Sequence, residues 1–485
     1  MLFNTVSYLV FLASAVLCYW LLPQDKRKWL LLAASLLFYA AWRWEFVFLI
    51  GFSSLVDYFF SLKIHDSHSP YKRRLFLVSS LSINLALLLY FKYTYFILDN
   101  VASVGHFLGQ EWMLDVGNII LPLGISFYTF LSISYTVDVY RRLFDPIRNF
   151  GVYLTYVMFW PHMIAGPILR AHELIPQITR PHRFHLEHLV VGVRWILLGL
   201  FLKVVLADQI APMVDDAFAI DPATLGGLDV MTMAFAFGFQ IYFDFAGYSM
   251  VAIGSARLLG VRFPDNFDWP YLATSPRVFW RRWHITLSSW IRDYLYLPLS
   301  GVAFRDRSEG GIEVQFEHRK STFRLTLALF LTWFIMGLWH GASWRFAFWG
   351  LWHAAFIFMY RLMHGRFEVW PSWILLVGGW AVTICVTMLG WIPFRAESLD
   401  HAVSLLARLG DLHSYTRLGF RENFYLVTFI LLGGMLLARA VLSLRPMLAR
   451  VRYAEPMVDV AVMASVMFGV FVFLRPISQF IYFQF

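Results

Sequence analysis

The chain has 485 residues, of which 59% are hydrophobic and 19% aromatic, while only 15% are charged. A soluble protein of this length carries far more charge, so the composition excludes a soluble globular enzyme. The formal net charge of +9 indicates basic connections on the cytoplasmic side of a membrane rather than binding to nucleic acid.

The apolar residues occur in long blocks, each able to span, or nearly span, a bilayer. The main blocks are 5–22, 75–98, 119–137, 189–206, 228–254, 373–391 and 424–437. With shorter blocks, they predict an all-α polytopic integral membrane protein with roughly 10–12 membrane-embedded helices. The first block follows MLFN, with no basic residue before it, so we expect a retained first helix rather than a signal peptide.

Lysine and arginine are confined to particular connections, which predicts the orientation of the chain. The basic connections are 25–28, 71–74, 141–142 and 170–183. The connections 99–117 and 208–229 contain no lysine or arginine. The positive-inside rule therefore predicts an extracytoplasmic N-terminus and cytoplasmic basic connections. The connection 396–422 should lie outside by this count, but its arginines fit that side poorly, so its topology stays open.

The block 150–169 is flanked by basic residues on both sides and contains WPHMIAGP, with Pro161 and Pro167. We expect a re-entrant hairpin or a broken helix there, buried in protein. The following stretch PHRFHLEH (181–188) holds three histidines but no carboxylate at metal-ligand spacing. We interpret it as a solvated junction rather than a metal site. The two cysteines, Cys18 and Cys385, lie inside apolar blocks and predict neither a disulfide framework nor a metal site.

Between residues 261 and 324 hydrophobicity falls and basic residues accumulate, which predicts a long cytoplasmic stretch. Large apolar residues recur there at three- and four-residue steps, the pattern of an amphipathic helix. They are Trp280, Trp283, Leu287, Trp290 or Ile291, and Tyr294. Beside this stripe, Arg281 and Arg282 could bind phosphate groups or anchor the helix at lipid headgroups.

Ionisable residues inside apolar blocks are candidates for function, because burying them in a membrane costs free energy. His340 ends the apolar run 325–339, where a histidine suits a general base. Its position alone fits a histidine hydrogen-bonded to a neighbouring helix equally well. By composition, His284 is an interfacial residue and His353 a structural one. Asp244, inside a spanning block, implies either a partner or a proton pathway.

Five ordered blocks of the chain match a family: 160–178, 239–271, 279–301, 338–354 and 391–402. They resemble the membrane-bound O-acyltransferases. The similarity is greatest to the bacterial polysaccharide branch, typified by the membrane subunit of alginate O-acetylation, and more distant to the D-alanyl transfer protein of teichoic acid. The resemblance implies a helical membrane core with cytoplasmic and extracytoplasmic funnels. We expect one domain over 1–485, with a motif-bearing core at about 118–402, N-terminal helices in 1–117 and C-terminal helices in 403–485.

The resemblance also implies roles for residues. The invariant histidine of the family falls on His340, as catalytic base, and its second conserved polar position falls on His284, which would position or polarise the reacting groups. The segment 279–299 would line the donor funnel, and no metal is implied. The residues expected to line the funnel are Trp280, Arg281, Arg282, Trp283, Ser288, Trp290, Arg292, Asp293, Asp244, Tyr248, Trp339 and His353.

Two features depart from the family pattern. The family often has an aspartate after GYS, where this chain has Met250, so Asp244 would have to serve or the carboxylate is dispensable. The stretch 302–324 is a longer, charged insertion, which leaves open the details of donor entry and partner docking.

The resemblance predicts transfer of acetyl from a cytoplasmic thioester, acetyl-CoA, with no bound cofactor, to hydroxyls of an exported polysaccharide such as alginate. It further implies an extracytoplasmic acetyltransferase partner and the inner membrane of a bacterium. An acyl carrier protein as donor, as in D-alanylation, stays an alternative. So do a lipid-linked sugar transporter and a scaffold subunit. The chain lacks a GxSxG nucleophile elbow, a Walker A loop, a GxGxxG after a strand and HExxH zinc spacing.

Overall fold

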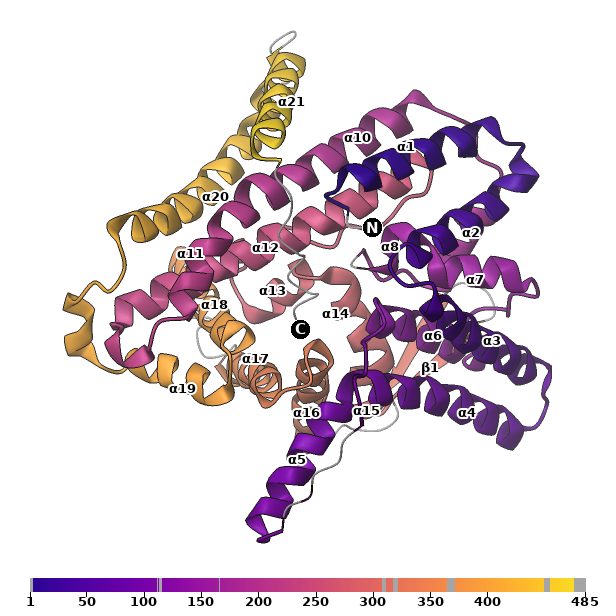
Figure 1. The fold of residues 1–485 in the computed structure, drawn as a ribbon, viewed down its shortest axis with the longest axis horizontal. Helices are drawn as coiled ribbons and strands as arrows, with labels where there is room; N and C mark the ends of the chain where they lie inside the picture. The colour runs from indigo at the N-terminus through magenta and orange to yellow at the C-terminus, as the bar shows by residue number, and fades with distance from the viewer. Residues whose placement is uncertain are drawn as a thin grey trace. The chain divides into compact units, whose positions relative to one another are not determined.

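The computed structural model describes residues 3–110, 112, 116–164, 166–307, 311–316, 322–363, 371–448 and 454–474. These residues are mostly helical (Figure 1), as the composition predicts. They form two compact units, each built from separate stretches of the chain. The first unit comprises 1–192, 255–265 and 284–332, and the second unit comprises 193–254, 266–283 and 333–485.

The helices up to residue 218 are α1 (Val6–Leu21), α2 (Gln24–Ala40), α3 (Glu45–Asp66), α4 (Pro70–Leu88), η1 (Leu89–Tyr93), α5 (Thr94–Phe107), α6 (Ile125–Tyr140), α7 (Phe150–Met158), α8 (Trp160–Met163), α9 (Ala171–Thr179), α10 (Leu186–Leu200), η2 (Phe201–Ala207) and α11 (Asp208–Phe218). The remaining elements are η3 (Pro222–Thr224), α12 (Gly227–Leu258), η4 (Pro270–Leu272), α13 (Pro276–Arg282), α14 (Ile285–Ile291), η5 (Arg292–Tyr296), α15 (Leu297–Leu299), β1 (Val302–Arg307), β2 (Gly311–Phe316), α16 (Thr322–His340), α17 (Trp344–Met363), α18 (Ser372–Arg395), α19 (Leu399–Arg408), η7 (Leu412–Thr416), α20 (Glu422–Leu448) and α21 (Ala454–Phe473).

Eight helical stretches in the described part of the chain are long and apolar enough to cross a membrane. They are Glu45–Asp66, Pro70–Phe107, Leu186–Phe218, Gly227–Leu258, Thr322–His340, Ser372–Arg395, Glu422–Ser443 and Pro456–Phe473. Two predicted blocks give shorter helices. Helix α1 has 16 residues, and α6 begins only at Ile125, because Gly124 adopts a left-handed backbone with φ of 73°. The chain is therefore a multi-pass membrane protein.

The prediction of a broken helix in 150–169 is confirmed. Helix α7 ends at Met158, and the single turn α8 follows Phe159. Trp160 is fully buried, and the buried His162 ring contacts the Tyr156 carbonyl oxygen through Nε2 at 3.0 Å. The irregular backbone is thus enclosed by protein, where membrane proteins tolerate it.

The prediction of one amphipathic helix through Trp280 and Tyr294 is wrong. Helix α13 ends at Arg282, and His284 has a left-handed backbone with φ of 42° and ψ of 56° before α14 begins. Such a conformation interrupts a right-handed helix and is uncommon for residues other than glycine. His284 is also 1% exposed, so its prediction as an interfacial side chain is wrong too.

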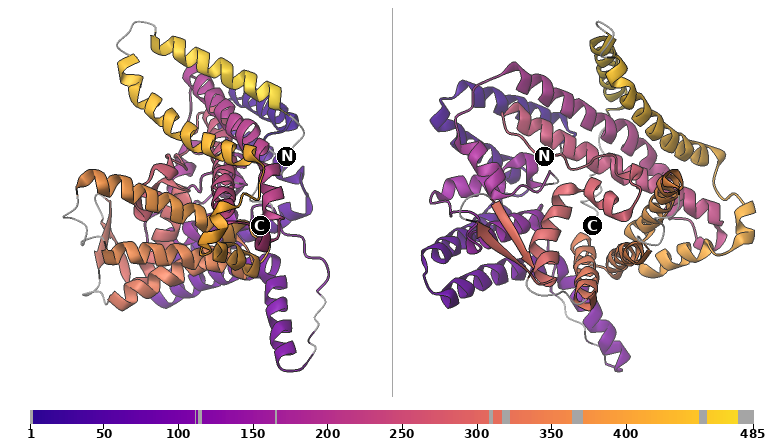
Figure 2. Two further views of the ribbon diagram at one scale, coloured as in Figure 1. Left: turned by 90° about the vertical axis from the view of Figure 1, so that its left-hand side faces the viewer. Right: turned by 180° about the vertical axis from the view of Figure 1, so that it is seen from behind.

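The insertion 302–324 contains the two strands described in this otherwise helical chain. Strands β1 and β2 pair in antiparallel register from Val302 opposite Phe316 to Arg307 opposite Gly311, and they appear as arrows in the right-hand view of Figure 2. The stretches 308–310 and 317–321 of the insertion lie outside the described residues.

The position of Asp244 in a spanning block implies a partner or a proton pathway, and the structure shows a partner. In the second unit, Lys203 on η2 places its Nζ 2.5 Å from Asp244 Oδ1 and 2.8 Å from Asp208 Oδ1. Lys203 is 3% exposed and Asp244 2%. Close helix packing brings them together: a Cβ at Gly199 would lie 2.5 Å from the Gly247 carbonyl oxygen, so the backbones of α10 and α12 almost touch.

Replacing the shared cation should destabilise the second unit strongly. We expect Lys203→Met to lower the free energy of unfolding by about 3–5 kcal/mol, since it leaves buried carboxylates without their countercharge. Adding Asp208→Asn and Asp244→Asn in the same chain should recover most of this loss. Thermal unfolding of the detergent-solubilised variants measures both effects. Equal stability of Lys203→Met and the wild type would contradict the prediction.

Candidate active site

His340 is positioned by a tight helical hairpin in the second unit. Helix α16 ends at His340, and α17 begins at Trp344 after a turn in which the Ser343 N–H donates to the Gly341 carbonyl oxygen at 2.8 Å. A Cβ at Gly337 would lie 2.2 Å from the Phe346 carbonyl oxygen. A Cβ at Gly341 would lie 2.1 Å from the Phe346 ring. Small residues therefore let the two helices meet closely at the end that carries His340.

Aromatic rings fix the orientation of the His340 ring. Its centroid lies 4.9 Å from those of Trp339 and Trp349 and 5.4 Å from that of Phe394, with interplanar angles of 73°, 83° and 69°. These are edge-to-face contacts, the arrangement that aromatic pairs prefer. His340 is 6% exposed. The structure thus holds a nearly buried imidazole at a helix end within an apolar, rigid surround.

Arg345, near the start of α17, has a structural role. Its Nη1 donates to the carbonyl oxygen of Phe394 at 2.9 Å and to that of Ala396. These carbonyls lie at the end of α18, where helical backbone oxygens lack intrahelical donors. The guanidinium also lies over the Phe346 ring, 4.4 Å from its centroid. Arg345 therefore fixes the end of α18, and with it Phe394, against the His340 hairpin.

His353, on α17, occupies an aromatic cage that the sequence did not reveal. Its ring lies 5.0 Å from Trp280, 5.1 Å from Trp349 and 5.7 Å from Trp333. It is fully buried, and neither ring nitrogen has a hydrogen-bond partner among the described residues. A Cβ at Gly390 would lie 3.0 Å from His353 Nε2, so α18 closes the cage from another side. Trp349 separates this histidine from His340.

His284 lies in the first unit, where it begins α14. That helix is held in place through Trp290, whose ring stacks on Phe130 at 3.9 Å and whose Nε1 donates to the Phe130 carbonyl oxygen at 3.0 Å. Thr286 Oγ1 accepts from the Ile168 N–H at 3.0 Å. The strained backbone of His284 is thus supported by anchored neighbours, a pattern that recurs at functional sites.

A charged network follows α14 on the π-helical turn η5. Asp293, 8% exposed, pairs with Arg170 and accepts from Arg292 Nε at 2.6 Å. Tyr294 donates its hydroxyl to both carboxylate oxygens of Asp138, at 2.9 and 2.8 Å. Single π-helical turns are often found at functional sites. The Arg292 side chain is 62% exposed, so the network leaves one guanidinium accessible.

The expected funnel residues fall into separate groups. Trp280, Trp283 and Trp339 are buried in the second unit, as are Asp244 and Tyr248 on α12. Trp290, Asp293 and the half-buried Ser288 follow His284 in the first unit. Arg281 is exposed, and Arg282 lies 4.0 Å from Asp268. Described residues that the sequence analysis missed are Asp138, Arg170, Lys203, Trp333, Trp349 and Phe394.

The sequence carried a signal for some of these residues. Asp138 ends an apolar block and Lys203 interrupts another, and an ionisable residue in such a place predicts a partner. Nothing in the local sequence links Arg170 to Asp293, because the two residues are distant in the chain.

Comparisons with known proteins agree with this architecture. The model of the MBOAT, membrane-bound O-acyltransferase family, matches residues 138–311. A probable alginate O-acetylase of Azotobacter vinelandii is 36% identical over 456 residues, which cover 94% of this chain and 86% of the relative. A peptidoglycan O-acetyltransferase of Helicobacter pylori is 33% identical over 442 residues, covering 84% and 79%. A teichoic acid D-alanyltransferase of Streptococcus thermophilus is 30% identical over 236 residues, covering 48% and 54%.

The alignment with the relative from Azotobacter vinelandii runs through nearly the whole of this chain. Helices long enough to cross a membrane make up much of the described chain. The chain therefore belongs to the membrane-bound O-acyltransferase family and is a multi-pass O-acyltransferase.

Proposed function

We propose that the protein takes an acetyl group from a cytoplasmic thioester, acetyl-CoA, and delivers it across the membrane for O-acetylation of an exported polysaccharide such as alginate. The observation that carries the proposal is the His340 imidazole, held at a helix end by aromatic rings within a chain whose long matches are O-acetylases. Because the chain belongs to an acyltransferase family, an enzymatic function is favoured over the transporter and scaffold alternatives.

In the proposed reaction, His340 acts as general base. The neutral imidazole takes the proton of an acceptor hydroxyl while the hydroxyl oxygen attacks the thioester carbonyl carbon. A carbon–oxygen bond forms, the carbon–sulfur bond breaks, and the leaving thiolate takes up the proton. The edge-to-face contacts with Trp349 and Phe394 support this role, since a base must be held in one orientation to act efficiently.

We propose that the segment 279–299 lines the donor funnel, with His284 positioning or polarising the reacting groups. The accessible Arg292, fixed by its contact with Asp293, supports recognition of an anionic donor. A guanidinium binds phosphate groups of coenzyme A through paired hydrogen bonds, and it equally complements an acidic carrier protein. A carrier-protein donor and D-alanyl transfer remain the second candidate, supported by the match to a teichoic acid D-alanyltransferase over about half of this chain.

The proposed setting is a bacterial inner membrane, with an extracytoplasmic N-terminus and basic connections on the cytoplasmic side. Acceptor hydroxyls of an exported polymer lie on the opposite side from the donor, so an extracytoplasmic acetyltransferase partner would complete the transfer. The proposed acceptor is alginate or another cell-envelope polysaccharide. The names of the two long matches support this substrate class.

Substitution of His340 should abolish transfer while leaving the protein folded. We expect His340→Ala, in reconstituted membranes supplied with acetyl-CoA, partner and acceptor, to release free CoA thiol at least about 100-fold more slowly than wild type, the usual contribution of a general base. His284→Ala should be severe with some residual activity, and His353→Ala milder. The exposed His106 on α5 provides the control, and His106→Ala should keep wild-type activity.

Equal activity of the His340, His284 and His353 variants would contradict the mechanism. The wild-type protein could instead release no CoA but transfer an acyl group from a loaded carrier protein. That result would identify the carrier protein, and not acetyl-CoA, as the donor.

The buried His284 should make stability depend on pH. Burial lowers the pKa of His284 to about 3, whereas histidine in an unfolded chain has a pKa of about 6.5. Below pH 6.5 the unfolded state therefore binds a proton that the folded state does not, so the free energy of unfolding falls as the pH falls towards 3. At pH 5 this group alone accounts for a loss of ~2 kcal/mol relative to pH 7.

We expect His284→Gln to remove that part of the pH dependence. Thermal unfolding at pH 7 and pH 5, in the same detergent, should show a smaller drop in Tm for His284→Gln than for wild type. His106→Gln should behave as wild type. An identical drop for His284→Gln would show that the imidazole does not stay neutral in the folded protein.

A further inference from the structure

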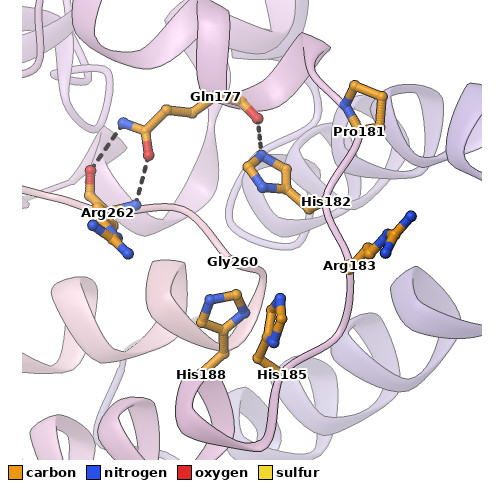
Figure 3. A pocket seen from close by; sticks show the side chains of 8 residues that line it. All are labelled: Gln177, Pro181, His182, Arg183, His185, His188, Gly260 and Arg262. Atoms are coloured by element: carbon orange, nitrogen blue, oxygen red, sulfur yellow. Dashed lines mark hydrogen bonds between the residues drawn. The ribbon is translucent and has the colours of Figure 1, made fainter.

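The first unit contains a basic cavity of about 500 Å³ that the proposed reaction does not use. It lies where the sequence analysis placed a solvated junction, and Figure 3 shows its side chains. Its lining combines two arginines and three histidines with no acidic side chain. The polar lining residues are Gln177, His182, Arg183, His185, His188 and Arg262.

Hydrogen bonds within the wall hold the cavity in shape. The Gln177 side chain accepts from the Arg262 N–H at 2.8 Å and donates to the Arg262 carbonyl oxygen at 3.0 Å (Figure 3). The Gln177 carbonyl oxygen contacts His182 Nε2 at 2.5 Å. These two hydrogen bonds involve only the backbone of Arg262, so they leave its guanidinium available to a ligand.

One wall atom is buried and unsatisfied. His188 Nδ1 has no hydrogen-bond partner among the described residues. The ring stacks on Trp20, with 6.3 Å between centroids, and Trp20 is itself fixed by a hydrogen bond from its Nε1 to the Leu258 carbonyl oxygen at 2.9 Å. Trp20 therefore fixes the His188 ring in the wall, with its Nδ1 turned away from solvent and close to Gly260.

The lining chemistry indicates an anion rather than a metal. Metal sites combine histidine with carboxylate or thiolate ligands or bring several histidines onto one ion. In the described part of the chain, no group of three or more histidine, cysteine, aspartate or glutamate side chains is placed so that it could hold a metal ion. Arginine carries a permanent positive charge and donates in a fork that matches phosphate oxygens. Two arginines without a lining carboxylate therefore favour a phosphate group.

The place of the cavity in the chain indicates where such a phosphate comes from. The cavity residues 181–185 come directly before α10, which opens the membrane span Leu186–Phe218. Large apolar side chains beside the cavity are exposed: Phe184 55%, Leu186 65% and Val190 59%. A basic pocket at the end of a membrane span can bind the headgroup of a lipid, and the apolar surface next to it can contact the acyl chains of the same lipid.

We propose that this cavity binds the phosphate headgroup of an anionic phospholipid, with the acyl chains along the exposed apolar face of α10. The guanidinium of Arg262 and the imidazoles of His185 and His188 contact the phosphate oxygens. The lipid stabilises the junction between α9 and α10 and ties it to the membrane surface.

The test measures lipid binding by the full-length protein, with a variant at an arginine outside the cavity as control. Purified wild type, Arg183→Gln/Arg262→Gln and Arg180→Gln are titrated with phosphatidylglycerol or phosphatidylcholine in detergent, and Tm and lipid retention in native mass spectrometry are recorded. Arg180 is the C-cap residue directly after α9, is exposed and does not line the cavity. We expect phosphatidylglycerol, but not phosphatidylcholine, to raise the Tm of wild type and Arg180→Gln. The double variant should bind phosphatidylglycerol at least about tenfold more weakly.

A second variant and a soluble probe complete the design. His185→Gln keeps both arginines and should weaken phosphatidylglycerol binding by a smaller factor, which tests the site without a change of two charges. Unchanged lipid binding by the double variant would overturn the proposal, as would an equal loss in Arg180→Gln. Inorganic phosphate that raises the Tm of wild type in phosphatidylcholine, where phosphatidylglycerol does not, would overturn the lipid assignment in favour of a soluble anion. None of these readouts depends on acyl transfer.

Discussion

The rest of this structure depends on one constraint: polar groups removed from water must find their partners inside the protein. The second unit shows this at three places. Lys203 is held by Asp208 and Asp244, and Arg345 satisfies carbonyls at the end of α18. Asp229 accepts N–H groups of Gly226 at 2.7 Å and Gly419 at 3.1 Å, so it ties the start of α12 to the connection before α20. The contacts of Lys203 with Asp244, of Arg345 with the end of α18 and of Asp229 with Gly419 join segments far apart in the sequence, so polar satisfaction also specifies the fold.

Close packing between helices is the second feature that stabilises this fold. Lipid tails are as apolar as leucine side chains, so helices in a membrane associate through shape and through close backbone approach. The glycines of α16, α17 and α10 serve this purpose, since a Cβ at Gly350 would lie 2.1 Å from the Trp333 carbonyl oxygen. The hairpin that presents His340 is narrow for this reason, and its narrowness brings Trp349 against both His340 and His353.

The sequence predicted what depends on local pattern. Hydropathy located most spans, and the prolines around His162 located the broken helix. It failed where a long-range contact overrides local preference. The spacing of large apolar residues from Trp280 to Tyr294 is that of a helix. No glycine or proline marks a break at His284, because its left-handed backbone depends on the packing around α14. The sequence implies either a partner or a proton pathway for Asp244, and only the packing of α10 on α12 shows that Lys203 is its partner.

The two histidines on either side of Trp349 differ in their position on the helices and in their exposure. His353 lies in the middle of α17 and is fully enclosed by indole rings, so a substrate could reach it only by displacing them. His340 lies at the end of α16, beside a glycine turn, and retains 6% exposure. The same aromatic surround therefore has two consequences: it encloses His353 completely, and it orients the ring of His340. This difference supports the proposed assignment of the base to His340 rather than His353, in line with the roles that the sequence resemblance implies.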